Sequence, residues 1–329
     1  HQLQKMFGFL ELTDRQDYNP HEFCFTFKDY DGNPVNVSEQ QDTQEFLNRL
    51  FDKLEFGIKH TPFRYITESV YGGKMCNQMI CNGCHNVTER YEAYYNLSLE
   101  VKNMKNVNES LEKMIQGETI DDYLCSNCKK KNSITKRACI SELPNVMIIY
   151  LQRIIFDMDT LMNQKVNSRL EFPFELDFEP YTKEGLEWRE RVKNKKKQAS
   201  NKDGGQGSGS ANKSAEDAKE DTEKEISMDK EDKEKGEENK YEEEPEDQNE
   251  EDLGPYKLKN KEYYSYRLVG TVCHLGTAEF GHYYSFINTN RRDPGKPDHN
   301  GKDRWLEFND STIRDFDLKN LEGECFGGQ

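Results

Sequence analysis

Residues 276–288 read GTAEFGHYYSFIN and place one histidine, His282, at the start of an aromatic run. Tyr, Phe and Ile are enriched in strands, so this stretch predicts a half-buried strand that begins at Gly281. A glycine there would let another backbone, or a substrate tail, come close beside the imidazole. Residues 304–310 read RWLEFND and predict a second strand. Together the two segments predict an antiparallel hairpin.

The register of this hairpin decides which side chain meets the histidine. If Asn288 pairs with Arg304, then His282 faces Asp310 and Asn309 lies one step away, although a slip of one residue would change that partner. Such a pair is the base–orienter half of a Cys-His-Asn/Asp arrangement, in which the orienter would hold Nδ1–H and leave Nε2 to accept a proton. Alternatively, His282 is a structural histidine, and Asn309 and Asp310 end a strand in a turn.

Two CxxC pairs, Cys81 with Cys84 and Cys125 with Cys128, predict a tetrahedral zinc site with four sulfur ligands. Four thiolates leave no position for water or substrate, so we expect the zinc to be structural. Two alternatives are four ordinary buried thiols and a c-type haem attached at CNGCH, which leaves the second pair unexplained. We expect His85 to be a neighbour of the metal and not a ligand. Paired CxxC motifs also favour a reducing compartment over a set of disulfides.

The first sixty residues predict helix, loop and helix. In SEQQDTQEFLNRLFDKLEFGI, Ser38 followed by Gln41 fits a capping box. On a helical projection Asp42, Glu45 and Arg49 share a polar side. The opposite, apolar arc contains Phe46, Leu47, Leu50, Phe51, Leu54 and Ile58. We therefore expect this helix to pack one face and to present two acids and an arginine on the other.

Strand-type patterns dominate from Thr61 to Pro180. The stretch NVMIIYLQRIIF, residues 145–156, predicts a buried central strand because it is rich in branched and aromatic residues. The stretch LEFPFELDFEPY, residues 170–181, alternates and is broken by two prolines, which is typical of an edge strand.

Residues 192–255 form a low-complexity segment that we expect to be a disordered insert between strands. From Ser214 to Asp252 there are 20 Asp/Glu against 6 Lys, a net charge of −14 within a chain total of −16. The rest of the chain is therefore nearly neutral, and this acidity argues against a nucleic-acid ligand. No apolar run approaches the roughly 20 residues of a membrane span, so we expect no membrane partner.

Several motifs together resemble the catalytic domain of the ubiquitin-specific proteases. QQDTQEFL is similar to the QQDAQEF helix of that family, and WLEFND to its third-residue box. The start HQLQKMF and the end ECFGG are closest to the large, fat-facets-like branch. The other matching segments are MICNGCHNVTERYEAYYNLSLEV, CSNCKKKNSITKRACISELPNVMIIYLQR, KVNSRLEFPFELDFEPYT and YRLVGTVCHLGTAEFGHYYSFI.

The resemblance implies an α+β papain-like cysteine protease fold of the ubiquitin-specific-protease type, with a partial helical thumb, zinc-bearing β fingers and an antiparallel β palm. The implied divisions are the partial thumb at 1–60, the zinc-binding fingers and start of the palm at 61–150, palm strands at 151–191, the insert at 192–255, and the palm with the His and Asn/Asp boxes at 256–329.

The resemblance also implies an activity, the thiol-dependent hydrolysis of the bond after the C-terminal glycine of ubiquitin. In that family pattern His282 is the general base, Asn309 takes the orienting position, and Asp310 is the adjacent acid. Asp42 and Glu45 would hold the basic ubiquitin tail through charge-assisted hydrogen bonds. The partners would be ubiquitin and ubiquitinated proteins, in the cytoplasm, the nucleus or both.

One departure from the family concerns the nucleophile. The family's Gly-x-x-Cys-aromatic-Met/Leu-Asn box precedes the QQD helix, but here only Cys24 precedes it, in HEFCFTFKDY, without the glycine, the asparagine or the spacing. The upstream oxyanion donor is missing with it. We therefore expect the C-terminal bulk of a deubiquitinase that is inactive on its own. The alternatives are a catalytically dead ubiquitin-binding module and, ranked last, a structural zinc-ribbon scaffold.

Overall fold

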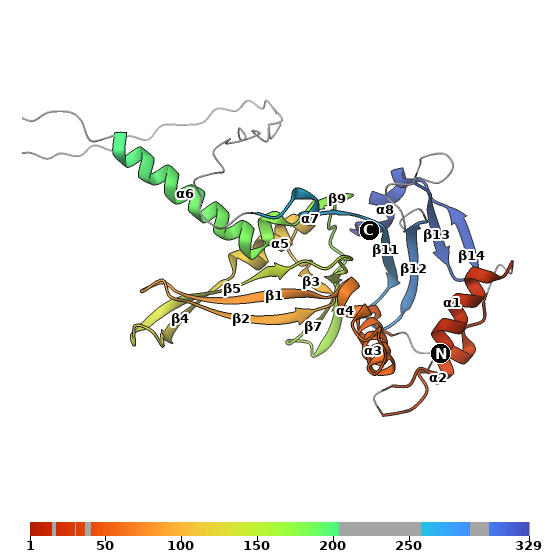
Figure 1. Ribbon diagram of the computed structural model, residues 1–329. Helices are drawn as coiled ribbons and strands as arrows, with labels where there is room; N and C mark the ends of the chain where they lie inside the picture. Colours follow the sequence, from red (N-terminus) through yellow and green to blue (C-terminus); the bar gives the residue numbers. More distant parts are fainter. Residues whose placement is uncertain (15–17, 30, 37–40, 204–257, 290–302, 329) are drawn as a thin grey trace, which may run out of the picture. The chain divides into compact units, whose positions relative to one another are not determined.

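The computed structural model describes residues 1–14, 18–29, 31–36, 41–203, 258–289 and 303–328 (Figure 1). The chain divides into two compact units, one of residues 1–186 with 259–329 and the other of residues 187–258. Most of the predicted insert, 192–255, lies outside the described residues. The first twelve residues of the predicted insert, 192–203, are helical and not irregular as expected. They belong to the helix α6 (Lys183–Asp203).

The N-terminal segment contains the two predicted helices, α1 (Gln2–Leu12) and α3 (Thr43–Ile58), but it also has a short helix in the predicted loop, α2 (His21–Thr26), and another where strands were expected, α4 (Ile66–Tyr71). The apolar arc of α3 packs as predicted, since the ring of Phe51 lies 5.1 Å from that of Tyr71 and 5.3 Å from that of Tyr95. The expectation for Arg49 is wrong, because this residue is only 7% exposed. Its guanidinium donates hydrogen bonds to Gln41 and Glu45. These bonds offset the free-energy cost of burying the positive charge.

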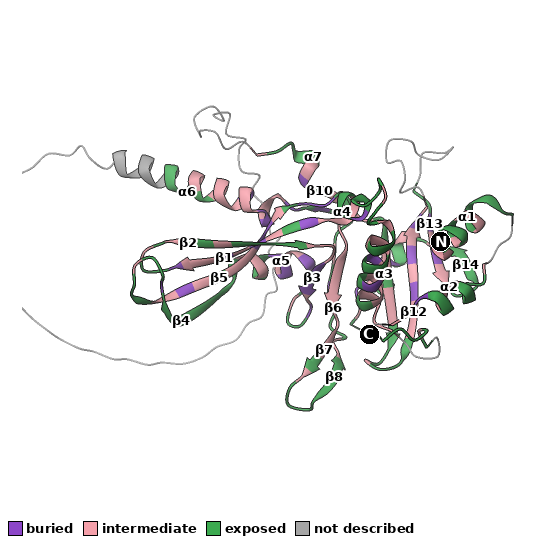
Figure 2. Ribbon diagram, turned by 60° about the horizontal axis from the view of Figure 1, so that its bottom comes forward, coloured by how far each residue is buried: buried purple, intermediate pink, exposed green. Residues whose placement is uncertain are grey.

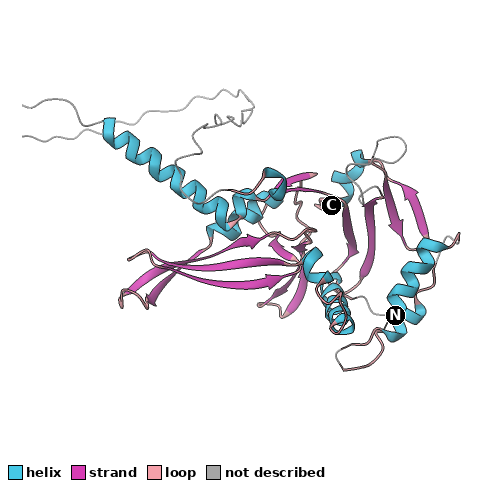
Figure 3. Cartoon of the chain, viewed as in Figure 1, coloured by secondary structure: helices cyan, strands magenta, loops and turns pink. Residues whose placement is uncertain are grey.

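The first four-stranded sheet, here called the cysteine-cluster sheet, has the antiparallel order β2–β1–β5–β4. Its strands are among the magenta arrows of Figure 3. They are β1 (Gly73–Cys81), β2 (Val87–Tyr94), β4 (Glu118–Leu124) and β5 (Lys131–Glu142). At about 3.3 Å per residue, the 12 residues of β5 extend for about 40 Å. The strand therefore runs from Ile134, packed against the cysteines, to Ile140, which belongs to the main hydrophobic core.

The main core forms where helix α5 (Val107–Gln116) packs on β3 (Leu97–Glu100) and the end of β5. Asn106 caps α5 by accepting a hydrogen bond from the Glu109 backbone N–H at 2.8 Å. The helix ends at Gly117 with φ of +74°, a conformation in which a side chain would be strained. The fully buried members of this core include Leu99, Val101, Leu111, Ile140, Leu170 and Phe178.

The predicted central strand at 145–156 is wrong as a single element. It is divided into β6 (Ile149–Gln152), parallel to β3, and β7 (Ile154–Asp157), antiparallel to β8 (Met162–Lys165). The break lies at Arg153, whose backbone N–H bonds to the Leu151 carbonyl and whose guanidinium donates to the carbonyls of Val166 and Ser168. A partly buried arginine with backbone partners therefore interrupts what composition alone predicts as one strand.

The second four-stranded sheet, here called the histidine sheet, has the antiparallel order β11–β12–β13–β14. Figure 2 shows buried residues along its two central strands. Its strands are β11 (Gly270–Gly276), β12 (Gly281–Asn288), β13 (Trp305–Asn309) and β14 (Thr312–Asp315). The predicted start of β12 at Gly281 is confirmed.

Short elements complete the first unit. They are β9 (Glu175–Asp177) paired with β10 (Ser265–Arg267), the 3-10 turns η1 (Glu179–Tyr181) and η3 (Leu318–Asn320), and the helices α7 (Lys261–Tyr264) and α8 (Leu321–Cys325). Among the described residues, no helix combines the length and the apolar composition that crossing a membrane requires.

Candidate active site and metal centre

His282 is the second residue of β12, directly after a tight hairpin turn. The turn closes with a hydrogen bond from the Thr277 backbone N–H to the Phe280 carbonyl at 2.7 Å. A Cβ atom on Gly281 would lie 1.9 Å from the Leu275 carbonyl oxygen, a distance that no real contact allows. Only glycine therefore lets the two strands approach so closely, and of the two expectations for Gly281 the structure shows the backbone approach.

The predicted register of the next hairpin is wrong by one residue. Asn288 pairs with Trp305 and not with Arg304, and the pairing continues to Ser285 opposite Phe308. Opposite residues of an antiparallel pair lie on the same face of the sheet, and so do residues two apart on one strand. By this alternation, Asn309 lies on the same face as His282. In the predicted register Asn309 would have pointed to the opposite face. The shift thus brings the amide, and not Asp310, to the imidazole.

The imidazole and the amide are in direct contact. His282 Nε2 lies 2.7 Å from Asn309 Oδ1, and the His282 side chain is 42% exposed. The Asn309 amide nitrogen lies 3.4 Å from a carboxylate oxygen of Glu307, which assigns Oδ1 to the imidazole. Since an amide oxygen only accepts, Nε2 is the protonated nitrogen and Nδ1 is the basic one. The predicted roles of the two ring nitrogens are therefore exchanged.

Asp310 occupies the two-residue turn between β13 and β14. Its backbone φ is +51°, in the left-handed region that Asp and Asn tolerate. Its carboxylate lies 3.8 Å from His282 Nε2 and the side chain is 79% exposed. The geometry therefore gives Asp310 a turn-forming role and only a screened electrostatic interaction with the imidazole.

Glu307 and Arg314 support Asn309, and neither was identified from the sequence. Glu307 accepts two hydrogen bonds from Arg314, at 2.7 and 2.9 Å, and its side chain is 10% exposed. These bonds from Arg314 hold the pKa of Glu307 below its usual range, so it stays a carboxylate. A sequence signal was present, because Glu307 alternates with Trp305 and so puts a charge on the buried face of the strand.

A lysine binds backbone carbonyls of β11, the strand that precedes His282 in the hairpin. Lys165 Nζ donates to the carbonyl oxygens of His274 and Gly276, at 2.8 and 2.9 Å. His274 pairs with Tyr283, so it lies on the face opposite His282, and its ring is 4.6 Å from that of Tyr283. Burial, followed by Lys165, lowers the pKa of His274. This second histidine is therefore held neutral beside the site.

Asp42 is the N-cap of α3, a role that the sequence assigned to Ser38, which lies outside the described residues. Its Oδ1 accepts from the backbone N–H groups of Gln44 and Glu45, at 2.8 and 3.1 Å. Its Oδ2 is 3.3 Å from the Tyr150 hydroxyl, and burial followed by Asp42 raises the pKa of Tyr150 to about 12. The Asp42 carboxylate thus already has three donors.

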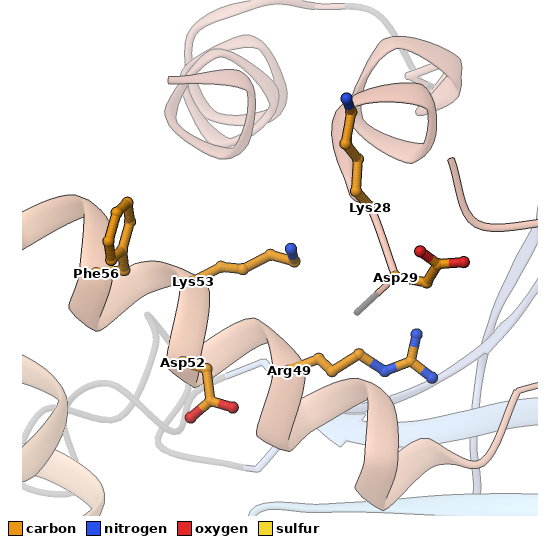
Figure 4. A pocket seen from close by; sticks show the side chains of 6 residues that line it. All are labelled: Lys28, Asp29, Arg49, Asp52, Lys53 and Phe56. Atoms are coloured by element: carbon orange, nitrogen blue, oxygen red, sulfur yellow. The ribbon is translucent and has the colours of Figure 1, made fainter. Parts of the chain in front are cut away.

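Glu45 is bound differently, because its side chain is 54% exposed and one oxygen accepts from Arg49 at 2.5 Å. The same arginine lines a cavity of about 250 Å³ with Lys28, Asp29, Asp52, Lys53 and Phe56 (Figure 4). This cavity contains none of the predicted site residues, so it adds no group to the candidate active site.

The nucleophile does not emerge from the geometry. All nine cysteines are free thiols, and Cys24 lies on α2. Within the described ranges, which include every cysteine, no sulfur is hydrogen-bonded to His282. The histidine and its amide are therefore assembled without a thiol partner in contact.

The four predicted metal-binding cysteines are brought together. The sulfur atoms of Cys81, Cys84, Cys125 and Cys128 all lie within 4.8 Å of one another. Cys84 Sγ is 3.7 Å from Cys125 Sγ, close to the edge of about 3.8 Å in a tetrahedron with metal–sulfur bonds of about 2.3 Å. His85, directly after Cys84, is exposed and has a backbone φ of +56°.

Backbone and side-chain donors surround these sulfurs. A backbone N–H at Asn86 lowers the pKa of Cys84 to about 6, and backbone N–H groups at Cys128 and Asn127 lower the pKa of Cys125. Asn132 Nδ2 lies 3.3 Å from Cys128 Sγ. The donors at Cys84 and Cys125 favour the thiolate, which is the form that binds a metal. At Cys128, a backbone N–H at Lys130 is outweighed by burial and the neighbouring sulfurs, which raise the pKa. With four sulfurs close to one another and two of them favoured as thiolates, the cluster fits a metal ion.

Comparison with known proteins decides the family. A family model described as ubiquitin carboxyl-terminal hydrolase matches residues 1–323. This chain belongs to the ubiquitin carboxyl-terminal hydrolase family. It is 32% identical over 332 residues to ubiquitin carboxyl-terminal hydrolase 34 of both mouse and human, and it is 31% identical over 332 residues to ubiquitin carboxyl-terminal hydrolase puf of Drosophila melanogaster. All of this chain is aligned in each case, but it spans only 8%, 8% and 7% of those proteins.

Solved structures support the fold of this family member. The SAGA Ubp8/Sgf11/Sus1/Sgf73 DUB module bound to ubiquitin aldehyde matches with a TM-score of 0.55 and 19% identity, over 88% of this chain and 48% of that one. A second structure of that module, bound to monoubiquitin, matches with a TM-score of 0.54 and 19% identity, over 87% of this chain and 47% of that one. The predicted α+β fold of ubiquitin-specific-protease type is confirmed.

Proposed function

We propose that this chain provides the general base, its orienting amide and part of the ubiquitin-binding surface of a thiol-dependent deubiquitinase. The main support is the 2.7 Å contact between His282 Nε2 and Asn309 Oδ1, with the amide oriented by Glu307. This contact leaves Nδ1 basic and available to take a proton. Family membership supplies the reaction class.

In the proposed reaction, His282 Nδ1 removes the proton of a cysteine thiol, and the thiolate attacks the carbonyl of the C-terminal glycine of ubiquitin. The imidazolium that forms is stabilised by Asn309 Oδ1 and by the negative charge of Glu307 behind it. It then protonates the leaving lysine amine, and water hydrolyses the thioester. The exposed fraction of His282, 42%, leaves room for the thiol and the substrate tail.

The nucleophilic thiol in this proposal is none of the nine cysteines of the chain. Cys24 lacks the family's sequence context, four cysteines gather in the metal cluster, and Cys76 and Cys139 are fully buried. The remaining two, on β11 and α8, contact each other. The 329 residues alone would therefore bind ubiquitin without cleaving it.

We propose that the four-cysteine cluster holds one structural Zn²⁺. Four thiolates complete a tetrahedral shell, so the ion would stabilise the end of the cysteine-cluster sheet and take no part in the reaction. The test is metal analysis of the purified chain. We expect about one equivalent of zinc, lost in Cys84→Ser and kept in Cys24→Ser; equal zinc in both variants would contradict the assignment.

Ubiquitin is the proposed partner. The neighbouring DUB modules were solved with ubiquitin aldehyde or monoubiquitin. In this chain the Glu45 side chain is 54% exposed and can bind a basic tail, whereas Asp42 acts mainly through the helix cap.

The test of the catalytic proposal is His282→Ala in a polypeptide that joins this chain to a nucleophilic cysteine. Removal of a general base costs about 10²–10⁴ in rate, so we expect kcat/KM on a fluorogenic ubiquitin substrate to fall by at least about 100-fold. Ubiquitin affinity, measured by calorimetry, should stay within about 2-fold. Unchanged turnover in His282→Ala would refute the assignment.

A ubiquitin-binding module without catalysis is the second candidate, favoured by the absence of a thiol in contact with His282 among the described residues. A ubiquitin probe with a C-terminal electrophile distinguishes the two. Covalent capture by the polypeptide that contains a cysteine, lost in His282→Ala, supports the enzyme. Reversible binding without capture supports the module.

A further inference from the structure

Two thiols that the proposed function does not use are in contact on the buried face of the histidine sheet, the same face as His282. Cys273 Sγ, on β11, is 3.6 Å from Cys325 Sγ at the end of α8. The Thr271 hydroxyl oxygen is 3.4 Å from the same Cys325 sulfur. Thr271 and Cys273 pair with Phe286 and Tyr284, so their side chains point to the buried face on which α8 packs.

The segment that contains Cys325 is held firmly against the rest of the unit. The Phe326 carbonyl accepts from the Leu170 backbone N–H at 2.8 Å and from Arg153 Nη2 at 2.9 Å. The rings of Phe172 and Phe326 lie 4.7 Å apart. These contacts hold the end of α8 in place, so the packing of the folded chain keeps the two sulfurs close together.

We propose that Cys273 and Cys325 form a reversible disulfide, a redox modification site separate from the metal cluster. The sulfurs are in van der Waals contact, and a bond of about 2.05 Å requires them to approach by about 1.5 Å. Both residues are half-buried and neither is fully enclosed, unlike the fully buried Cys76 and Cys139.

The oxidant is a low-molecular-weight disulfide such as oxidised glutathione. The Cys325 thiolate attacks one sulfur of it, so that a mixed disulfide forms and one glutathione thiolate leaves. Cys273 then gives its proton to a released thiolate and attacks the Cys325 sulfur, which expels the second glutathione. Two protein thiols are oxidised and two glutathione thiols are produced. The hydrogen bond from Cys273 favours this order, because it lowers the pKa of Cys325 and raises that of Cys273.

The bond would close a loop that contains the candidate active site, since His282 and Asn309 both lie between the two cysteines. A crosslink across about 50 residues restricts the unfolded chain and stabilises the folded state. For a chain of this size we expect the melting temperature of the oxidised form to rise by about 5–10 °C.

The experiment equilibrates the zinc-loaded 329-residue chain in glutathione buffers of increasing oxidised fraction. Free thiols are then blocked by alkylation, and the digest is examined by mass spectrometry. We expect a crosslinked peptide pair joining residues 273 and 325, two hydrogens lighter than the reduced pair and lost on reduction. It should form while the zinc stays bound, as monitored with a colorimetric chelator.

Cys273→Val, which keeps an apolar side chain, and Cys325→Ser should each abolish the rise in melting temperature, while Cys24→Ser should keep it. Two variants on different elements protect the test against a folding defect in one of them. The proposal is overturned if no 273–325 pair forms before zinc is released. It is equally overturned if the pair forms without raising the melting temperature.

Discussion

Asn309→Ala tests the arrangement of the candidate active site most directly. The substitution removes the oxygen that lies 2.7 Å from His282 Nε2 and leaves the neighbouring Asp310 in place. It also removes the preference of the His282 proton for Nε2, because no other acceptor among the described residues lies within hydrogen-bond distance of that nitrogen. The matched control is Asp310→Ala, which removes the more distant and more exposed partner.

The structure predicts very different losses for the two variants. A hydrogen bond to a group that becomes charged contributes about 1.5–3 kcal/mol, so Asn309→Ala should lower kcat/KM by about 10–150-fold. Asp310 lies 3.8 Å from the imidazole and is 79% exposed, where solvent screens the charge. An exposed ion pair is worth at most about 1 kcal/mol, so Asp310→Ala should lower kcat/KM by less than about 5-fold.

Two assays measure these effects. Turnover of a fluorogenic ubiquitin substrate, in a polypeptide that includes a nucleophilic cysteine, gives kcat/KM for both variants. Nitrogen-15 NMR of the 329-residue chain reports the tautomer of His282, which we expect to carry its proton on Nε2 in the wild type and to lose that preference in Asn309→Ala.

A greater loss in Asp310→Ala than in Asn309→Ala would refute the reasoning, since distance and exposure both favour the amide. A wild-type proton resting on Nδ1 would do the same, because the basic nitrogen would then be the one already in contact with Asn309.

Other predictions follow from the same geometry. Asp42→Asn keeps the helix cap and should leave the melting temperature unchanged, while Asp42→Ala should cost about 1 kcal/mol in urea unfolding. Cys84→Ser should lower the melting temperature by about 5 °C or more through loss of zinc. Gly281→Ala should destabilise by about 2–4 kcal/mol, because its Cβ meets the Leu275 carbonyl at 1.9 Å. The pKa of Glu307 is lower in the folded chain than in the unfolded chain, where it is roughly 4.3, so this carboxylate stabilises the fold at pH values above the unfolded-state pKa. That stability is lost as the pH falls through the folded-state pKa. Glu307→Gln should therefore make the melting temperature less sensitive to acid between about pH 7 and pH 3.

The four-cysteine cluster was predictable from sequence because its chemistry is local. Each CxxC turn presents two sulfurs to one side, and the structure brings all four within 4.8 Å. The start of β12 at Gly281 was equally predictable, since a glycine followed by Tyr, Phe and Ile is a short-range signal. The apolar arc of α3 followed from a 3.6-residue period in the same way.

The histidine–amide contact depended on information that is not local. Periodicity places His282 and Asn309 on strands, but a change of one residue in register moves every side chain to the other face. The register follows from burial of Phe286 and Trp305, 1% and 3% exposed, against side chains from outside the hairpin. The pairing of Asn288 with Trp305 is therefore a property of the assembled core.

The remaining errors share this origin. The strand expected over 145–156 is broken because Arg153 bonds to carbonyls that include Phe326, 173 positions away. Arg49 is buried because Gln41 and Glu45 accept its hydrogen bonds in the folded chain. The sequence by itself determined the start of β12, the apolar face of α3, the four-cysteine cluster and the family, since these depend on residue chemistry and short spacing. Only the tertiary structure decided the partner and tautomer of His282, because packing between distant segments selects one register and one hydrogen-bond network from several that the local pattern allows.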